Sequence, residues 1–86
     1  MKITRSDLFK RDYKKLPEKV KVQTDKALRL LVTDLSHPSL RIKKIKSREN
    51  IWEARITKNY RLSFRVTGDT YILRKIGKHK EILRRP

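Results

Sequence analysis

Apolar residues recur at helical spacing in the first part of the chain. Phe9, Tyr13 and Leu16 lie at positions i, i+4 and i+7, which puts them on one face of a helix. Pro17 interrupts this face. Because proline is tolerated in the first turn of a helix, it starts a second helix that ends at residues 36–38. The apolar face of the second helix consists of Val20, Ala27, Leu28, Leu31 and Leu35. The spacing predicts a helical hairpin joined at Pro17.

Alternation of apolar and polar residues, which is typical of strands, replaces the helical spacing after Pro38. Residues 52–56 and 60–66 alternate in this way and are joined by turn residues at 58–59, which predicts a β-hairpin. Residues 71–76 are apolar at four of six positions, which is enough to predict a strand inside the sheet. The second half of the chain is therefore predicted to be a sheet.

Two less regular segments complete the expected fold. Residues 2–5 are predicted to be a short edge strand, and residues 41–46 a short strand or an irregular segment. The order β-α-α-β-β-β predicts an α+β fold, with the helical hairpin packed on one face of a mainly antiparallel, twisted sheet. Residues 1–86 are expected to be a single domain, because the chain is too short for two independent cores.

The polar positions of the predicted strands define the second face of the sheet. Since the helices cover the apolar face, polar residues that alternate with it should project from the other side. These residues are Glu53, Arg55, Arg61 and Arg65.

The net charge of the chain is strongly positive. Lys and Arg number 25 against 9 Asp and Glu, a formal charge of +16. Residues 1–35 hold 10 basic and 5 acidic side chains, and residues 36–86 hold 15 and 4, so the predicted sheet is the more positive half. Such a field attracts polyanions, of which nucleic acid is the first choice and an acidic protein the second.

Composition excludes several classes of protein. The chain has no cysteine, so it has neither a disulfide framework nor a thiolate metal site. It also has no apolar run of the length of a membrane span, and its first residues do not resemble a signal peptide. A cytoplasmic protein that does not bind membranes is therefore expected.

The segment Trp52 to Val66 resembles the RelE/ParE superfamily of bacterial and archaeal toxin–antitoxin modules. Three further features agree: the Leu16-Pro17 joint between the helices, the Thr67-Gly68-Asp69 turn, and the closing segment Ile76 to Leu83. The likeness is to the YoeB branch in the first segment and to YafQ and RelE at Gly77-Lys78-His79. It spans nearly the whole chain.

The resemblance implies an mRNA interferase with a RelE-like fold. Such a toxin enters the ribosomal A site and cleaves message there, and an antitoxin wrapped around it silences it. The ribose 2′-hydroxyl attacks the adjacent phosphate and a 2′,3′-cyclic phosphate forms without metal or cofactor. The reaction needs a group that assists loss of the 2′ proton, a group that protonates the leaving oxygen, and cations that hold the phosphate.

The resemblance also implies catalytic residues. Arg61 matches the family arginine, and its planar guanidinium suits a phosphate whose charge is growing. Arg55 matches a basic position of the family on the neighbouring strand. His79 falls where the family has His or Arg, and histidine exchanges protons near neutral pH. We expect these three side chains to converge on the face opposite the helical hairpin.

The general base stays open between a carboxylate and a lysine. Glu53 is the only carboxylate on the predicted polar face, whereas YoeB takes its carboxylate from the preceding segment, where this chain has lysines. The residues expected to bind RNA phosphates are Lys43, Lys44, Lys46, Arg65 and Lys78. Leu83 stands where many relatives carry an aromatic residue that stacks on a base, so stacking there is lost.

Two other functions fit the same sequence. A ParE-type toxin that poisons gyrase shares the fold and needs no acid–base pair, although its helical hairpin is longer. A basic domain that binds RNA or the ribosome without cleaving it fits the missing aromatic residue at Leu83. In either toxin reading the expected partner is an antitoxin of acidic character, and the free toxin is expected to be a monomer.

Overall fold

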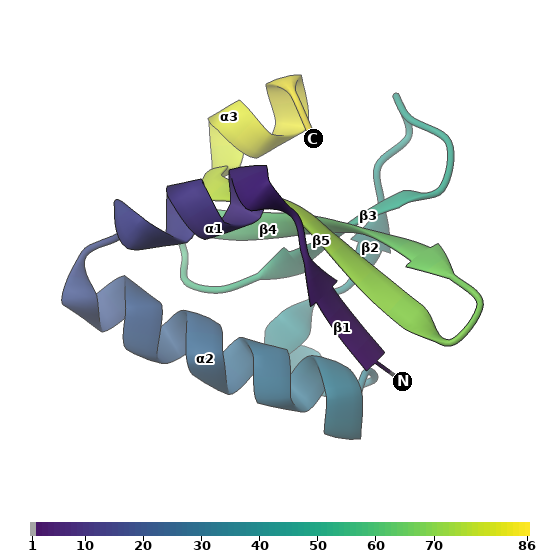
Figure 1. Ribbon diagram of the computed structural model, residues 1–86, viewed down its shortest axis with the longest axis horizontal. Coiled ribbons are helices and arrows are strands. Elements are labelled where there is room, and N and C mark those ends of the chain that lie inside the picture. The colour runs from purple at the N-terminus through teal and green to yellow at the C-terminus, as the bar shows by residue number, and fades with distance from the viewer. Residues whose placement is uncertain (1) are drawn as a thin grey trace.

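The structure is a computed structural model that describes residues 2–86. Five strands form one mixed sheet in the order β1-β5-β4-β3-β2 (Figure 1). In chain order the elements are β1 (Lys2–Arg5), α1 (Asp7–Lys14), α2 (Glu18–Thr33), the 3-10 turn η1 (Pro38–Leu40), β2 (Lys43–Lys44), β3 (Ile51–Arg55), β4 (Tyr60–Thr67), β5 (Thr70–Lys78) and α3 (His79–Arg84). The α+β fold predicted from the sequence is confirmed.

The register of the strands explains the mixed character of the sheet. β1 pairs in parallel with β5, from Lys2 opposite Thr70 to Arg5 opposite Leu73, and every other pair is antiparallel. β5 therefore lies inside the sheet and β1 at its edge, as the sequence predicted. Such a parallel contact is possible because the helical hairpin supplies the long crossover that parallel neighbours need.

The hairpin of α1 and α2 covers one face of the sheet. Ser6 caps α1, because its Oγ accepts a hydrogen bond from the N–H of Phe9 at 3.0 Å. α2 follows Pro17 and ends at Thr33. Leu35, expected on the buried face of that helix, lies beyond its end and is 41% exposed, so this prediction is wrong.

The core lies between the hairpin and the apolar face of the sheet. It buries Phe9, Leu16, Val20, Ala27, Leu28, Leu31, Leu40, Ala54, Leu62, Phe64, Tyr71, Leu73 and Ile76. Ala54 and Leu62 are partners in the β3–β4 register, and Leu62 and Ile76 in the β4–β5 register, so one row of the sheet faces the helices. The neighbouring row, which holds Glu53 and Ser63, faces the other way.

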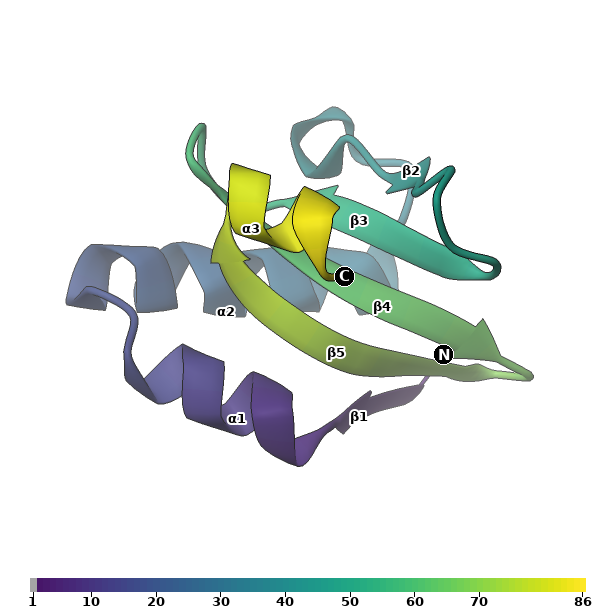
Figure 2. The same cartoon turned by 90° about the horizontal axis from the view of Figure 1, so that it is seen from above.

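The second face of the sheet carries a further helix, which the sequence did not predict. α3 lies on it, on the side of the sheet opposite α2 (Figure 2). Ile82 of α3 is 1% exposed, and the carbonyl oxygen of Pro86 accepts hydrogen bonds from Ser63 Oγ at 2.8 Å and Arg74 Nε at 3.3 Å. Gly77, the first residue of the Gly77-Lys78-His79 segment, lies inside β5. The polar face of the sheet is therefore partly covered.

The helices of residues 2–86 are all too short or too polar to cross a lipid bilayer.

Candidate active site

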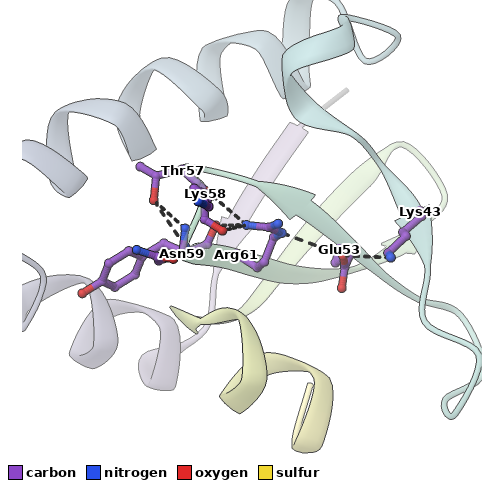
Figure 3. Close-up of polar contacts among 7 residues, drawn as sticks. Lys43, Glu53, Thr57, Lys58, Asn59 and Arg61 are labelled. Carbon is purple, nitrogen blue, oxygen red and sulfur yellow. Dashed lines mark hydrogen bonds and ion pairs between the residues drawn. The ribbon is translucent and has the colours of Figure 1, made fainter.

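Arg61 on β4 lies at the centre of the candidate site (Figure 3). Its Nη1 donates hydrogen bonds to three carbonyl oxygens of the β3–β4 turn, at 2.6 Å to Thr57, 3.1 Å to Lys58 and 3.0 Å to Tyr60. The Thr57 hydroxyl holds the turn, because it accepts from the backbone N–H groups of Asn59 and Tyr60. The side chain of Arg61 is 14% exposed. The guanidinium is thus fixed in one orientation.

Glu53 on β3 lies beside this guanidinium and is 2% exposed. Its Oε1 is 4.0 Å from Arg61 Nε and 3.8 Å from Lys43 Nζ, while Oε2 is buried and has no hydrogen-bond partner in the described part of the chain. Lys43 is the register partner of Glu53 on β2. A buried carboxylate therefore lies between two cations, with one oxygen left for a further proton donor.

A hollow of about 310 Å³ opens next to Glu53. Its walls are Lys43, Lys44, Ile45, Lys46, Ser47, Glu53 and Leu83. The structure thus brings three of the four predicted phosphate-binding lysines, Lys43, Lys44 and Lys46, to one place with Glu53. Leu83 supplies an apolar wall from α3, at the position where the resemblance led us to expect an aromatic residue. We name this hollow the lysine cleft.

The surroundings of Arg61 act on its pKa in opposite directions. Burial lowers the pKa of the Arg61 guanidinium most, and the positive charges of Arg55 and Arg41 lower it further, while the Glu53 carboxylate raises it. An arginine keeps its charge under such shifts, because its ordinary value lies far above neutral pH. Positive charges are therefore concentrated at this site, and a bound phosphate would reduce the repulsion between them.

Arg55 and His79 lie at the same end of the sheet as Arg61. Arg55 is the register partner of Arg61 on β3, although it also borders a hollow between α2 and η1. His79 begins α3, and its N–H donates to the carbonyl oxygen of Asn59 at 2.8 Å. Its Nδ1 is buried without a hydrogen-bond partner in the described residues. That the three side chains reach a single phosphate stays a prediction.

Two predicted RNA-binding residues lie away from this centre. Arg65 is exposed on β4 opposite Ile51, four residues or about 13 Å along the strand from Arg61. Lys78 pairs with Tyr60, so alternation turns it toward the helical hairpin, where it lines a separate hollow with Asp12 and Lys15. Neither residue borders the lysine cleft.

The structure adds two residues that the sequence analysis did not single out. Arg41 is close enough to lower the pKa of Arg61, and its φ of 43° lies in the left-handed region. Thr57 orders the turn whose carbonyls hold the guanidinium. Arg41 belongs to the basic segment of residues 41–46, which was a usable signal, whereas a single threonine in a turn gives none.

No group of three or more His, Cys, Asp and Glu side chains within residues 2–86 is arranged to hold a metal ion. The groups gathered at this site are cations and one carboxylate, and one imidazole lies at the same end of the sheet. Such a set binds a phosphate and moves protons near it.

Comparison with known proteins gives a consistent picture. A family model described as the ParE toxin of the type II toxin–antitoxin system ParDE matches residues 3–83. No curated protein matches the chain.

Solved structures share the fold. A chain of the RelB–RelE antitoxin–toxin complex from Methanococcus jannaschii is 28% identical, with a TM-score of 0.75 over 93% of this chain and 94% of that one. YafQ from Escherichia coli has a TM-score of 0.78 at 18% identity, over 93% and 94% of the two chains. A YoeB/ParE toxin from Agrobacterium tumefaciens has a TM-score of 0.77 at 18% identity, over 92% and 99%.

Proposed function

The chain belongs to the ParE toxin family of type II toxin–antitoxin systems, and from this premise we propose that it is an mRNA interferase, an endoribonuclease that cleaves message on the ribosome. The observation that carries the proposal is that Lys43 and Glu53 line the lysine cleft, while Arg61 lies beside Glu53 with its Nε 4.0 Å from Oε1. A site that only binds a polyanion gains nothing from a buried carboxylate, because a negative charge repels phosphate. A carboxylate at this place is useful where a reaction requires a group that accepts a proton.

The chemistry follows from these groups. The 2′-oxygen of the ribose bonds to phosphorus while the bond from phosphorus to the 5′-oxygen breaks, which leaves a 2′,3′-cyclic phosphate and a 5′-hydroxyl. Glu53 Oε2, the oxygen without a hydrogen bond, accepts the 2′ proton. His79 donates a proton to the leaving 5′-oxygen. Arg61 and Lys43 stabilise the charge that grows on the phosphate.

The remaining lysines bind RNA on either side of the reacting phosphate. Lys44 and Lys46 line the cleft and are exposed, so they remain free to contact phosphates that do not react. Contacts of this kind hold a substrate in register and carry no sequence information. Leu83 packs against a base or a sugar and cannot stack as an aromatic side chain does.

The partner that silences the toxin is proposed to be an antitoxin of acidic character. Support comes from the net charge of +16 and from the RelB–RelE complex, in which a related fold is held with its antitoxin. An acidic chain laid over the sheet half would neutralise the charge that RNA needs.

The decisive experiment is in vitro translation followed by primer extension, which maps cuts in the message. Arg61→Ala is expected to reduce cleavage at least about 100-fold, because a charge contact made to the reacting phosphate is lost. Arg61→Lys keeps the charge but loses the planar fork, so it should restore only part of the activity. Arg29→Ala, on the exposed side of α2, is the matched control and should cleave normally.

The fold of each variant needs a separate check, because Arg61 also holds the β3–β4 turn. Thermal unfolding of Arg61→Ala, Arg61→Lys and Arg29→Ala supplies it. Full cleavage by a folded Arg61→Ala protein would overturn the proposal.

The family match itself favours one alternative, a ParE-type toxin that inhibits gyrase. This function needs binding alone. In a DNA supercoiling assay the alternative predicts inhibition that survives Glu53→Gln and His79→Gln, and intact message in the translation assay. The mRNA interferase predicts cuts in the message and no effect on supercoiling. The short α1 helix, of 8 residues, supports the interferase.

A further inference from the structure

A second basic hollow lies on the same face of the sheet as the lysine cleft. It measures about 280 Å³ and is lined by Arg48, Ile51, Arg74, Lys75, Arg85 and Pro86. No acidic side chain lines it, and none of its four cationic side chains pairs with an Asp or Glu side chain within residues 2–86. Four positively charged side chains therefore border one hollow, which favours the binding of an anion. We name it the arginine hollow.

An irregularity of the sheet builds the arginine hollow. Neighbouring residues of a regular strand point to opposite faces, yet Arg74 and Lys75 both line it. The β4–β5 register explains this: Phe64 pairs with Leu73 and Ser63 with Lys75, so Arg74 is an extra, bulged residue. A bulge of this kind redirects a side chain, and bulges are frequent beside functional sites. Here it adds a guanidinium to the face that α3 occupies.

Hydrogen bonds fix one wall of the arginine hollow in place. Arg74 Nε donates to the carbonyl oxygen of Pro86 at 3.3 Å, and Ser63 Oγ donates to the same oxygen at 2.8 Å. Pro86 and Ile51 are buried. Arg48 and Arg85 are exposed at the rim, and their side chains make no ion pair there. A preordered wall with free cations at the rim is the arrangement expected of an anion site.

The arginine hollow and the lysine cleft lie at the two ends of one row of the sheet. Lys43, Glu53, Ser63 and Lys75 are successive register partners on β2, β3, β4 and β5. Three strand spacings separate the ends of this row, about 14 Å. The end of α3 lies between them, because Leu83 borders the lysine cleft and Arg85 the arginine hollow.

We propose that the arginine hollow is a second phosphate-binding subsite, which holds the backbone of the RNA strand bound in the lysine cleft at a phosphate that is not cleaved. Guanidinium groups match phosphate oxygens in pairs. No Asp, Glu or His side chain lines the arginine hollow, so it is proposed to bind RNA without cleaving it. Its only apolar walls are buried, so a protein segment finds no apolar surface to dock on, and RNA is the better occupant. The inference rests on the proposed function, since it takes RNA as the ligand.

Fluorescence anisotropy with uncleavable RNA tests the subsite. The probe is a single-stranded, fully 2′-O-methylated RNA of about 12 nucleotides, compared with a trinucleotide of the same chemistry. The two phosphates of the trinucleotide are neighbours along the chain and cannot occupy both hollows. The variant is Arg48→Gln combined with Arg85→Gln, both exposed and outside the proposed catalytic groups. The control is Arg11→Gln combined with Arg29→Gln, which removes the same charge from the exposed helices.

The arginine-hollow variant should bind the longer RNA about tenfold more weakly than the control variant does, with unchanged affinity for the trinucleotide. Its slope of log K against log salt should be lower by about 1.4, since each lost phosphate contact in a single strand removes about 0.7. Lys75→Gln, a separate change in the same hollow, should lower the affinity in the same direction. Thermal unfolding confirms that each variant is folded.

If the arginine-hollow variant and the control variant lost the same affinity for the longer RNA, the subsite would be overturned, because binding would then depend only on the total positive charge of the protein. Loss of binding to polyglutamate with unchanged RNA binding would also overturn it, in favour of an acidic protein. Neither result depends on cleavage, because the probe cannot react. A failure of Arg61→Ala to stop cleavage would instead count against the proposed function and leave the subsite standing.

Discussion

Glu53 illustrates how single residues decide what this site can do. Its carboxylate is almost completely buried, and both neighbouring cations approach Oε1 alone, at 3.8 and 4.0 Å. These separations exceed hydrogen-bond lengths, so attraction between charges, and not a directed bond, holds the group. A buried charge that is only partly compensated is costly in a protein. A substrate hydroxyl that donates to Oε2 would complete the set of contacts.

Tyr13 offers a residue-scale prediction about pH. Its hydroxyl donates to Asp25 Oδ1 at 2.9 Å, and this hydrogen bond raises the pKa of Tyr13, with smaller contributions from burial and from the charge of Asp25. Asp25→Ala should return the pKa toward the ordinary value of 10.0. Absorbance at the phenolate band during an alkaline titration measures the change.

The sign of the effect on stability follows from linkage. Because the pKa is higher in the folded state than in the unfolded one, the interaction stabilises the fold below the unfolded value and is lost as pH rises through the folded value. The difference in unfolding free energy between wild type and Asp25→Ala should therefore shrink in strongly alkaline solution. Identical titrations of the two proteins would contradict the assignment. Asp7→Ala, in the first turn of α1, is a control.

The sequence predicted part of this site and missed the rest for physical reasons. Alternation alone put Glu53, Arg55 and Arg61 on one face, because strand geometry fixes which way each side chain points. It did not predict that Glu53 is buried, since burial depends on segments that pack over the strand from elsewhere in the chain. The bonds from Arg61 to the β3–β4 turn were equally hidden, because they depend on the conformation of that turn.

At the scale of elements, α3 is the part of the fold that periodicity could not predict. It has six residues, no capping side chain and one fully buried position, Ile82. So short a helix is marginal by itself and depends on its packing against the sheet. The two longer helices and the alternating strands each present several residues on one face, and this is why their patterns were sufficient. Leu35 was misplaced because the pattern does not say where a helix ends.

The contribution to stability of the contact between α3 and the sheet can be measured by mutation. Ser63 is fully buried, and its Oγ donates to the Pro86 carbonyl at 2.8 Å. Ser63→Ala should lower the unfolding free energy by about 1 kcal/mol, because one hydrogen bond is lost while Arg74 still satisfies the carbonyl. Urea unfolding measures this cost, and faster exchange of the Ile82 amide would locate it at α3. Thr67→Ala, at the exposed end of β4, should change neither the unfolding free energy nor the exchange rate of the Ile82 amide. If Thr67→Ala had the same effect as Ser63→Ala, a specific contact of Ser63 with Pro86 would be excluded.

At the scale of the whole molecule, the positive charge is divided unequally between the two halves of the chain. The helical hairpin carries the smaller excess and buries the core, while the sheet half carries the larger excess and both basic hollows. The larger part of the positive charge therefore lies in the half of the chain that also holds the proposed catalytic groups. Removing charge from the two halves should have different consequences.

Matched triple substitutions in the two halves of the chain test this division of charge. Replacing Lys43, Lys44 and Lys46 together by Gln should lower the salt slope for single-stranded, uncleavable RNA by about 2, since three phosphate contacts are lost. The same change at Lys10, Lys19 and Lys26, which are exposed on α1 and α2, should lower it by much less. Equal slopes for the two triple variants would show that only the total charge matters.

The parallel contact between β1 and β5 also governs when the molecule can assemble. Residues 2–5 pair with residues 70–73, and Ser6 Oγ donates to the carbonyl oxygen of Arg74 at 2.9 Å. The first strand therefore has no partner until most of the chain has been synthesised, and contacts of such long sequence separation form late. A nascent chain cannot complete the sheet, nor bring His79 to Arg61, before its last third has left the ribosome. The delay separates the making of the polypeptide from the onset of its action, and a neutralising partner already present in the cell has that interval in which to meet it.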